Sequence, residues 1–141
     1  MKKLISPLAF LILLALGSCK KNAVVVAKDP TPTVSNVSGS YTIAKITLKN
    51  NATGQETEQV YDECKRDDQL NFNLDLTFNY VDAGIVCQSP GDWNGAWALP
   101  NSTTLSIDGS TSTIIKFTGT NLNLSDAYDA DNTLITYLVR K

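Results

Sequence analysis

Short runs of alternating apolar and polar residues, separated by turn-forming residues, recur along the chain from residue 37 onward. A period of two residues is typical of β-strands with one buried face, and no helical apolar period competes with it here. The alternating positions include Tyr41, Ile43, Lys45 and Thr47 on one face, then Leu70, Phe72 and Leu74, then Leu76, Phe78 and Tyr80, then Trp93, Trp97 and Leu99, then Leu105 and Ile107, Ile115 and Phe117, Leu122 and Leu124, and Thr133 to Val139. The pattern predicts an all-β domain of eight or nine strands.

The turns between these runs are short. Turn signals stand at residues 50–54, 100–102 and 108–110, each only a few residues long. Such connections favour antiparallel hairpins in sequence order, and closing the series into a barrel removes its exposed edges. We therefore expect an antiparallel up-and-down barrel of about eight strands. Side chains can fill the interior of a barrel of that size, or leave room for one small ligand.

The N-terminus combines a positive segment, an apolar run and a cysteine. Residues 2–3 are lysines, the run from Leu4 to Leu16 is almost wholly apolar, and small residues 17–18 precede Cys19. The run is too short for a spanning helix and has the layout of a secretory signal. The end of this segment resembles the lipobox of bacterial lipoproteins. The alternative is an ordinary secreted protein with a chance cysteine near its cleavage site.

The lipobox resemblance implies that residues 1–18 are a signal peptide and that Cys19 carries a lipid anchor. Several acyl chains would hold the mature protein firmly on a membrane. By analogy with the family, the lack of an Asp after Cys19 argues against retention in the inner membrane, and the lack of an acidic run argues against display on the cell surface. We expect the outer membrane, with the protein facing the periplasm.

Residues 19–36 are expected to form the lipidated cysteine and a tether, and residues 37–141 the domain. The tether contains Pro30 and Pro32, which favour an extended backbone. Its apolar part, Ala23 to Ala27, could instead pair as a strand, although no hairpin partner lies beside it.

Composition excludes several classes of function. The 141-residue chain has no histidine, which rules out His-based catalytic triads and His-ligated metals. After Cys19 there are ten basic and fourteen acidic residues, a net side-chain charge of −4. Without a basic stripe, nucleic acid is not an expected partner. No nucleophile–base pair is visible and no cofactor is expected, so we predict a protein that is not an enzyme.

Two cysteines remain once Cys19 is assigned to the anchor. Cys64 precedes the strand at Leu70 and Cys87 follows the strand at Tyr80, so they lie at the open ends of one predicted hairpin. In an oxidising compartment such a pair predicts a disulfide. By restricting the unfolded chain, it would stabilise the folded state by roughly 3 kcal/mol. A redox or metal pair is the alternative, but the spacing is not C-x-x-C.

Two acidic segments could bind a cation. Asp62, Glu63, Asp67 and Asp68 surround Cys64, and Asp126, Asp129 and Asp131 lie near the chain end. The second group resembles an oxygen-ligand loop for calcium but lacks the Gly and closing Glu of an EF-hand. A solvated loop and a plain hairpin loop are favoured, and no metal site is predicted.

Several short motifs, in order, resemble the lipocalin-like domains of small bacterial lipoproteins. Gly39-Ser40-Tyr41 stands where lipocalins carry Gly-x-Trp, residues 75–78 resemble a D-G-T-F hairpin, and residues 95–99 are similar to a second G-x-W strand. The chain departs from the pattern where Tyr41 replaces Trp and Leu76 replaces the turn Gly. The resemblance covers residues 37–140 and implies an eight-stranded barrel, but no substrate.

The aromatic residues distinguish a barrel that binds a small ligand from one whose interior is filled. Most fall on the strand face that carries Leu and Ile, which places them inside the barrel. Small residues at Gly95, Ala96 and Ala98 suggest room beside Trp97. The expected ligand-lining set for a small hydrophobic ligand is Tyr41, Phe72, Phe78, Tyr80, Trp97, Phe117 and Tyr137. The alternative is a filled core, in which the barrel is a structural or protein-interaction module, and the oligomeric state is left open. An exposed aromatic patch around Trp93 would favour that alternative.

Overall fold

The computed structural model describes residues 28–87 and 91–141, and these form nine strands and two short helices. The elements are α1 (Val34–Val37), β1 (Gly39–Asn50), β2 (Glu56–Glu58), the 3₁₀ helix η1 (Glu63–Lys65), β3 (Gln69–Phe72), β4 (Thr77–Val81), β5 (Trp93–Asn101), β6 (Thr104–Ile107), β7 (Ser110–Phe117), β8 (Asn121–Ala127) and β9 (Asn132–Arg140). The predictions for residues 1–27, Cys19 included, lie outside the described residues.

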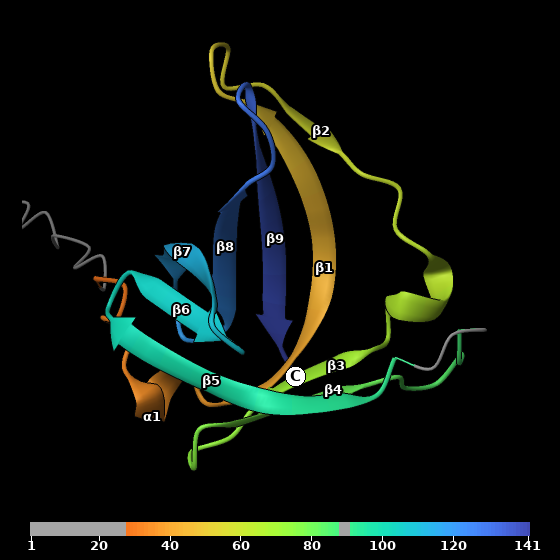
Figure 1. The fold of residues 1–141 in the computed structure, drawn as a ribbon, viewed down its shortest axis with the longest axis vertical. Coiled ribbons are helices and arrows are strands. Elements are labelled where there is room, and N and C mark those ends of the chain that lie inside the picture. The colour runs from red at the N-terminus through yellow and green to blue at the C-terminus, as the bar shows by residue number, and fades with distance from the viewer. Residues whose placement is uncertain (1–27, 88–90) are drawn as a thin grey trace, which may run out of the picture.

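The strands form one antiparallel sheet that closes on itself. Neighbours follow the chain in the order β2-β1-β3-β4-β5-β6-β7-β8-β9, and β1 also pairs with β9 (Figure 1). One edge of β1 pairs with β9 along nearly its whole length, while β2 and β3 share the other edge. Because β2 and β3 together occupy one place in the ring, the barrel has eight positions. The predicted all-β, up-and-down barrel of about eight strands is confirmed.

β1 carries a bulge that changes which residues face inward. Ile43 pairs with Leu138 and Lys45 with Tyr137, so Ala44 is an extra residue between two regular stretches. A bulge of this kind reverses the alternation beyond it. The prediction that Lys45 and Thr47 share the face of Tyr41 and Ile43 is therefore wrong, and Ile46 and Leu48 face inward in their place.

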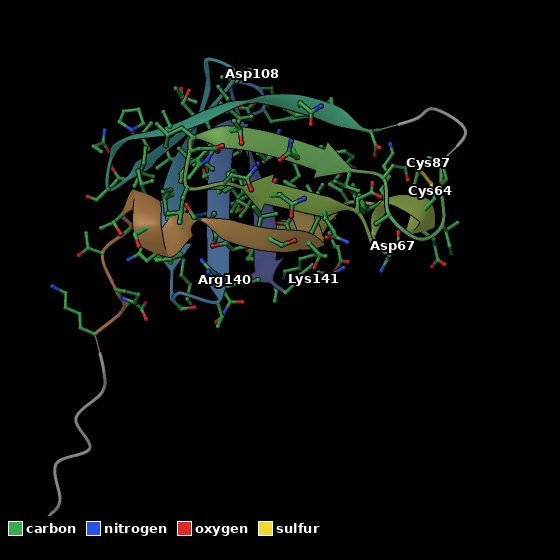
Figure 2. The ribbon with its side chains drawn as sticks, turned by 90° about the horizontal axis from the view of Figure 1, so that it is seen from below. Cys64, Asp67, Cys87, Asp108, Arg140 and Lys141 are labelled. Atoms are coloured by element: carbon green, nitrogen blue, oxygen red, sulfur yellow. A yellow bond between two sulfur atoms is a disulfide. The ribbon has the colours of Figure 1, made fainter. Side chains whose placement is uncertain are left out.

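One end of the barrel, which we call the closed end, is covered by α1. The other end, where β1 meets β2, β4 leads to β5 and β8 turns into β9, is the open end. Figures 1 and 2 both show α1 on the opposite side of the molecule from the disulfide-linked loops. The strand ends at Phe72, Phe117 and Arg140 belong to the closed end.

Residues 33–36 belong to the expected tether, but in the structure they fold onto the closed end. Thr33 and Asn36 form a reciprocal capping box, with the Thr33 N–H donating to Asn36 Oδ1 at 2.7 Å. Such a box satisfies backbone groups that a short helix would leave free. Val34 packs against the core and Val37 is fully buried. These two apolar side chains, three residues apart, hold α1 against the barrel.

Arg140 fastens α1 to the barrel. Its guanidinium donates to the Asn36 and Val37 carbonyl oxygens and, at 2.6 Å, to the Tyr41 hydroxyl. The Tyr41 hydroxyl in turn donates to the Val37 carbonyl at 2.8 Å. Burial raises the pKa of Tyr41, and the neighbouring Arg140 opposes that rise. The first and last strands are thus tied to the helix that covers them.

Candidate functional site

Aromatic side chains fill the closed half of the interior. Phe72 lies at the centre, with ring centroids 5.7 Å from Tyr41, 5.0 Å from Phe78 and 5.4 Å from Trp97. These four side chains are at most 2% exposed, and Phe117 is buried with them. Edge-to-face contacts of this kind add to the stabilisation from burial. These five residues of the expected ligand-lining set lie inside the barrel and pack against one another.

The small residues beside Trp97 do not create the room that the sequence suggested. A Cβ atom at Gly95 would overlap the carboxylate of Asp108, which accepts a hydrogen bond from the Ala96 N–H at 2.7 Å. The Trp97 indole N–H donates to the Asn73 carbonyl at 2.8 Å, which holds the ring in place. Gly95 therefore makes space for a neighbouring turn rather than for a guest.

The open half of the interior differs from the closed half. Ile46 and Leu48 on β1, and Leu134 on β9, lie on the inward face set by the pairing of Ile43 with Leu138. All three are only half-buried, and they do not pack against the buried core cluster. These inward-facing apolar side chains are therefore only partly covered at this end of the barrel.

Trp93 lies at the open end of β5. It shares the inward face with Trp97, and its ring stands 4.8 Å from the buried Phe78 ring, yet 41% of its surface is exposed. One side of the indole thus continues the aromatic core, while the other side is exposed at the open end.

Tyr137 does not belong to the interior. It is adjacent to the buried Leu138 on β9 and so points to the opposite face of the strand. Its hydroxyl donates to Glu56 at 2.6 Å, and the Lys45 ammonium stands 4.5 Å from its ring centre. Hydrogen bonds from Tyr137 and Thr47 lower the pKa of Glu56. The expected inward orientation of Tyr137 is wrong, because Leu138 holds the inward position.

Tyr80 is part of a polar group at the edge of the open half. Its hydroxyl donates to the carboxylate of Asp68, a side chain only 2% exposed, and Asp68 also accepts from the Ala83 N–H at 3.2 Å. Burial first, and then the bond to Asp68, raise the pKa of Tyr80 well above the ordinary value, and the neighbouring Tyr61 raises it further. Tyr80 therefore stays neutral and acts as a structural donor.

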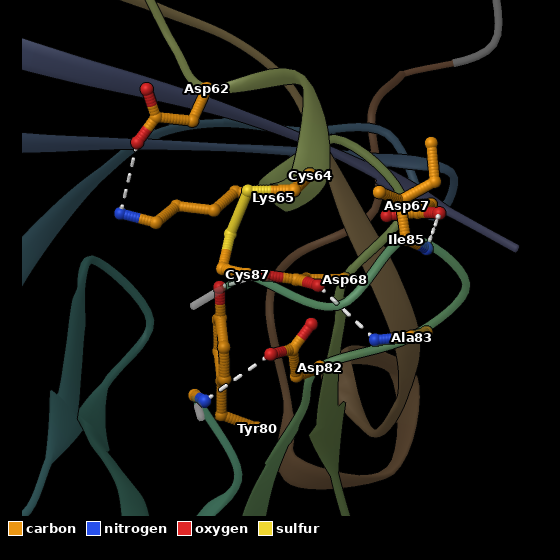
Figure 3. The surroundings of a disulfide bond; sticks show 11 residues. Asp62, Cys64, Lys65, Asp67, Asp68, Tyr80, Asp82, Ala83, Ile85 and Cys87 are labelled. Atoms are coloured by element: carbon orange, nitrogen blue, oxygen red, sulfur yellow. Dashed lines mark hydrogen bonds and ion pairs between the residues drawn. A yellow bond between two sulfur atoms is a disulfide. The ribbon is translucent and has the colours of Figure 1, made fainter. Parts of the chain in front are cut away.

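A disulfide joins Cys64 and Cys87, with Cα atoms 5.4 Å apart (Figure 3). It links η1 to the segment after β4, as the sequence predicted for the two ends of one hairpin. Nearby, the Ile85 N–H donates to Asp67 at 3.0 Å, and Lys65 forms an ion pair with Asp62 at 3.4 Å. The disulfide and these contacts define one rim of the open end.

The acidic segments have local structural roles. Asp129 accepts hydrogen bonds from the backbone N–H groups of Asp131 and Asn132, both at 2.8 Å, as a plain hairpin turn requires. Within residues 28–87 and 91–141, no group of three or more His, Cys, Asp or Glu is placed to hold a metal ion. In the same part of the chain, no helix is long and apolar enough to cross a membrane.

A hollow of about 330 Å³ lies outside the barrel at the closed end. Residues 29–32 form one wall, and residues 102–103 and 114–117 form the rest. It therefore lies between the N-terminal segment and β7, and its lining includes the core residues Ile114 and Phe117. Of the expected ligand-lining residues, only Phe117 is part of its lining.

Sequence reasoning missed the residues that face the open half. The inward orientation of Ile46 and Leu48 follows from the bulge at Ala44, and a single sequence does not predict such a bulge. Asp126 was considered only as a loop ligand, although it continues the alternation of Leu122 and Leu124 and therefore faces inward. That alternation was the one signal able to place it.

The fold defines a class: an antiparallel eight-position barrel, closed by a short helix at one end, with Ile46, Leu48, Leu134 and Asp126 facing inward toward the other. A family model for lipocalin-like domains matches residues 37–124, more than half of the chain. The protein belongs to this lipocalin-like family. A search of curated proteins and a search of solved structures each found no match.

Proposed function

We propose that the chain is a lipid-anchored lipoprotein of the cell envelope whose barrel binds a small apolar ligand in its open half. The anchor is Cys19, the anchored membrane is the outer membrane, and the domain faces the periplasm. The lipobox-like residues 16–19 support the anchor, and the family supports a binding role. A role in binding rather than catalysis also suits a chain without histidine.

One observation carries the ligand proposal. The inward-facing side chains Ile46, Leu48 and Leu134 are apolar and remain partly exposed, whereas the closed half is filled by rings in mutual contact. Covering such surface with an apolar guest stabilises a complex by ~25 cal/mol per Å² buried. The ligand would rest on the exposed side of Trp93.

A second function is favoured by a different observation. Val60, Ile85, Val86 and Trp93 are exposed apolar residues near the open end, which suits a surface that contacts another protein. In that case the filled aromatic core makes the barrel a scaffold, and the module acts through its rim.

Tryptophan fluorescence separates the two functions. Use the chain from residue 20 onward, titrate it with a panel of hydrophobic dyes and amphiphiles, and compare Trp97→Phe, which retains Trp93, with Trp93→Phe, which retains Trp97. A saturable change in the Trp97→Phe variant and a smaller one in Trp93→Phe support the ligand proposal. Absence of saturable binding in the parent across the panel favours the scaffold.

The anchor has its own test. Cys19→Ala removes the thiol that would receive the lipid, so the variant should leave the membrane fraction when cells are fractionated. Ser18→Ala keeps the thiol and a small residue before it, and it should fractionate like the parent. A Cys19→Ala protein that stays in the membrane would contradict the anchor.

A further inference from the structure

We infer that the closed end of the barrel rests against the bilayer and that the open end points away from it. The inference rests on the proposed lipid anchor at Cys19. It identifies a membrane-facing surface made of the α1 end, the β3–β4 turn and the wall of the outer hollow. A ligand would then enter from the aqueous side rather than directly from the lipid.

The first argument is the place where the chain leaves the domain. Residues 29–32 lie against residues 102–103 and the end of β7, and Pro30 stands next to Gly119 in the β7–β8 turn. All these belong to the closed end. Figure 2 shows the described chain ending beside α1, on the far side from Cys64 and Cys87. The anchor therefore joins the domain at its closed end.

The second argument is reach. From Cys19 to Lys28 the chain spans nine residues, which extend to about 30 Å at most. β1 alone runs for 12 residues from the closed end to the open end, a contour length of about 40 Å. To bring the open end onto the bilayer, the tether would have to run back along nearly the whole barrel. Contact through the closed end requires no such extension.

The third argument is the distribution of charge. Among the described residues, the closed end carries four basic groups, Lys28, Lys116, Arg140 and Lys141, against two acidic ones, Asp29 and Asp75. Asp108, which accepts from the Ala96 N–H, lies level with the β3–β4 hairpin and belongs with them, and the remaining eleven acidic and four basic residues lie on the open half. An anionic bilayer attracts the first end and repels the second within a Debye length. Lys20 and Lys21, next to the anchor, add to this attraction.

The turn between β3 and β4 supplies apolar contact. Leu74 and Leu76 are exposed, at 68% and 41%, at the tip of this closed-end hairpin. Leu76 adopts φ +67°, a backbone conformation that usually selects glycine. Two leucine side chains held outward at the end where the anchor attaches suit the interfacial region of a bilayer.

The experiment measures which end of the lipidated protein lies near lipid. Reconstitute the mature protein into vesicles of phosphatidylethanolamine and phosphatidylglycerol containing brominated acyl chains. Attach a fluorophore to Leu74→Cys at the closed end or to Tyr128→Cys at the open end, since both side chains are exposed in hairpin turns. Quenching should be several-fold stronger at position 74. Equal quenching, or stronger quenching at position 128, overturns the orientation.

Two controls separate the contribution of surface charge from that of the lipid anchor. Lys116→Glu should reduce the difference between the two labels on anionic vesicles, whereas Lys49→Glu on the open half should not reduce it. If Lys116→Glu has no more effect than Lys49→Glu, charge does not contribute to the orientation. Vesicle flotation precedes the quenching measurement. Protein that fails to float contradicts the anchor and the orientation together, whereas floating protein with equal quenching contradicts the orientation alone.

Discussion

Tyr80 joins the aromatic core to the disulfide-linked rim through a single hydroxyl group. Its ring packs against the core, and its hydroxyl satisfies the buried Asp68, which the Ala83 N–H also contacts. A buried carboxylate that loses one of its donors keeps the cost of desolvation without the compensating bond. The stability of this corner therefore depends on the neutral, hydrogen-bonded form of Tyr80.

We predict that Tyr80→Phe lowers the free energy of unfolding by about 1–3 kcal/mol, because Asp68 loses a donor while staying buried. Urea unfolding at neutral pH measures this. The control is Tyr128→Phe, which removes the hydroxyl of an exposed tyrosine. It should leave the free energy of unfolding unchanged. An unchanged midpoint in Tyr80→Phe would show that the bond to Asp68 contributes nothing.

The same residue predicts a pH dependence. The pKa of Tyr80 is raised in the folded state above its ordinary value of 10.0. Its contribution is therefore fully present below pH 10 and is lost as the pH rises beyond that, because the unfolded chain ionises first. The parent should lose more stability above pH 10 than Tyr80→Phe does.

Leu76 and Lys45 show why single residues are harder to place than strands. Leucine occupies a left-handed turn position that costs of order 1 kcal/mol, so local preference alone would not place it there. The hairpin around it, in which Asp75 accepts from the Thr77 N–H at 3.0 Å, determines the conformation. Lys45 faces outward because of a bulge, and tertiary pairing rather than sequence determines that bulge.

At the level of elements, β2, η1 and β3 together replace one continuous strand. β1 is long enough to pair with β3 near its start and with β2 near its end, and the chain between them leaves the barrel through η1. The disulfide and the hydrogen bonds of Asp67 and Asp68 hold this segment against the residues after β4 (Figure 3). The rim of the open end therefore depends on a covalent link.

We predict that replacing both Cys64 and Cys87 by serine lowers the free energy of unfolding by roughly 3 kcal/mol, because the cysteines are 23 residues apart and the link restricts the unfolded chain. Urea unfolding with and without reductant measures it. Reductant should shift the parent toward the double variant and leave the double variant unchanged. A parent that is insensitive to complete reduction would contradict the prediction.

Strands were predictable from sequence because their signal is local. A two-residue apolar alternation between turn residues marks eight of the nine observed strands, and the exception is β2, whose three residues are polar and exposed. The helix α1 was missed because a single turn has no periodicity to detect. Its signals, the Thr33–Asn36 box and the pair Val34 and Val37, become meaningful only once Arg140 is known to lie opposite.

For the whole molecule, closure of the barrel followed from short connections and the need to remove edges. The division into a filled closed half and an apolar open half could not be predicted in the same way. It depends on which rings meet inside, on the space that Gly95 yields to Asp108, and on the bulge in β1. Long-range packing therefore determines the candidate site, even where the sequence predicts the fold.

The central claim is that a ligand binds in the open half of the barrel. Methyl NMR of the isoleucine and leucine side chains tests it directly, with a ligand found by the fluorescence titration. We predict that saturating ligand shifts the methyl signals of Ile46, Leu48 and Leu134, while those of the buried Leu122 and Leu138 stay in place. Unmoved signals at Ile46, Leu48 and Leu134, or shifts confined to Ile115 beside the outer hollow, would contradict the claim.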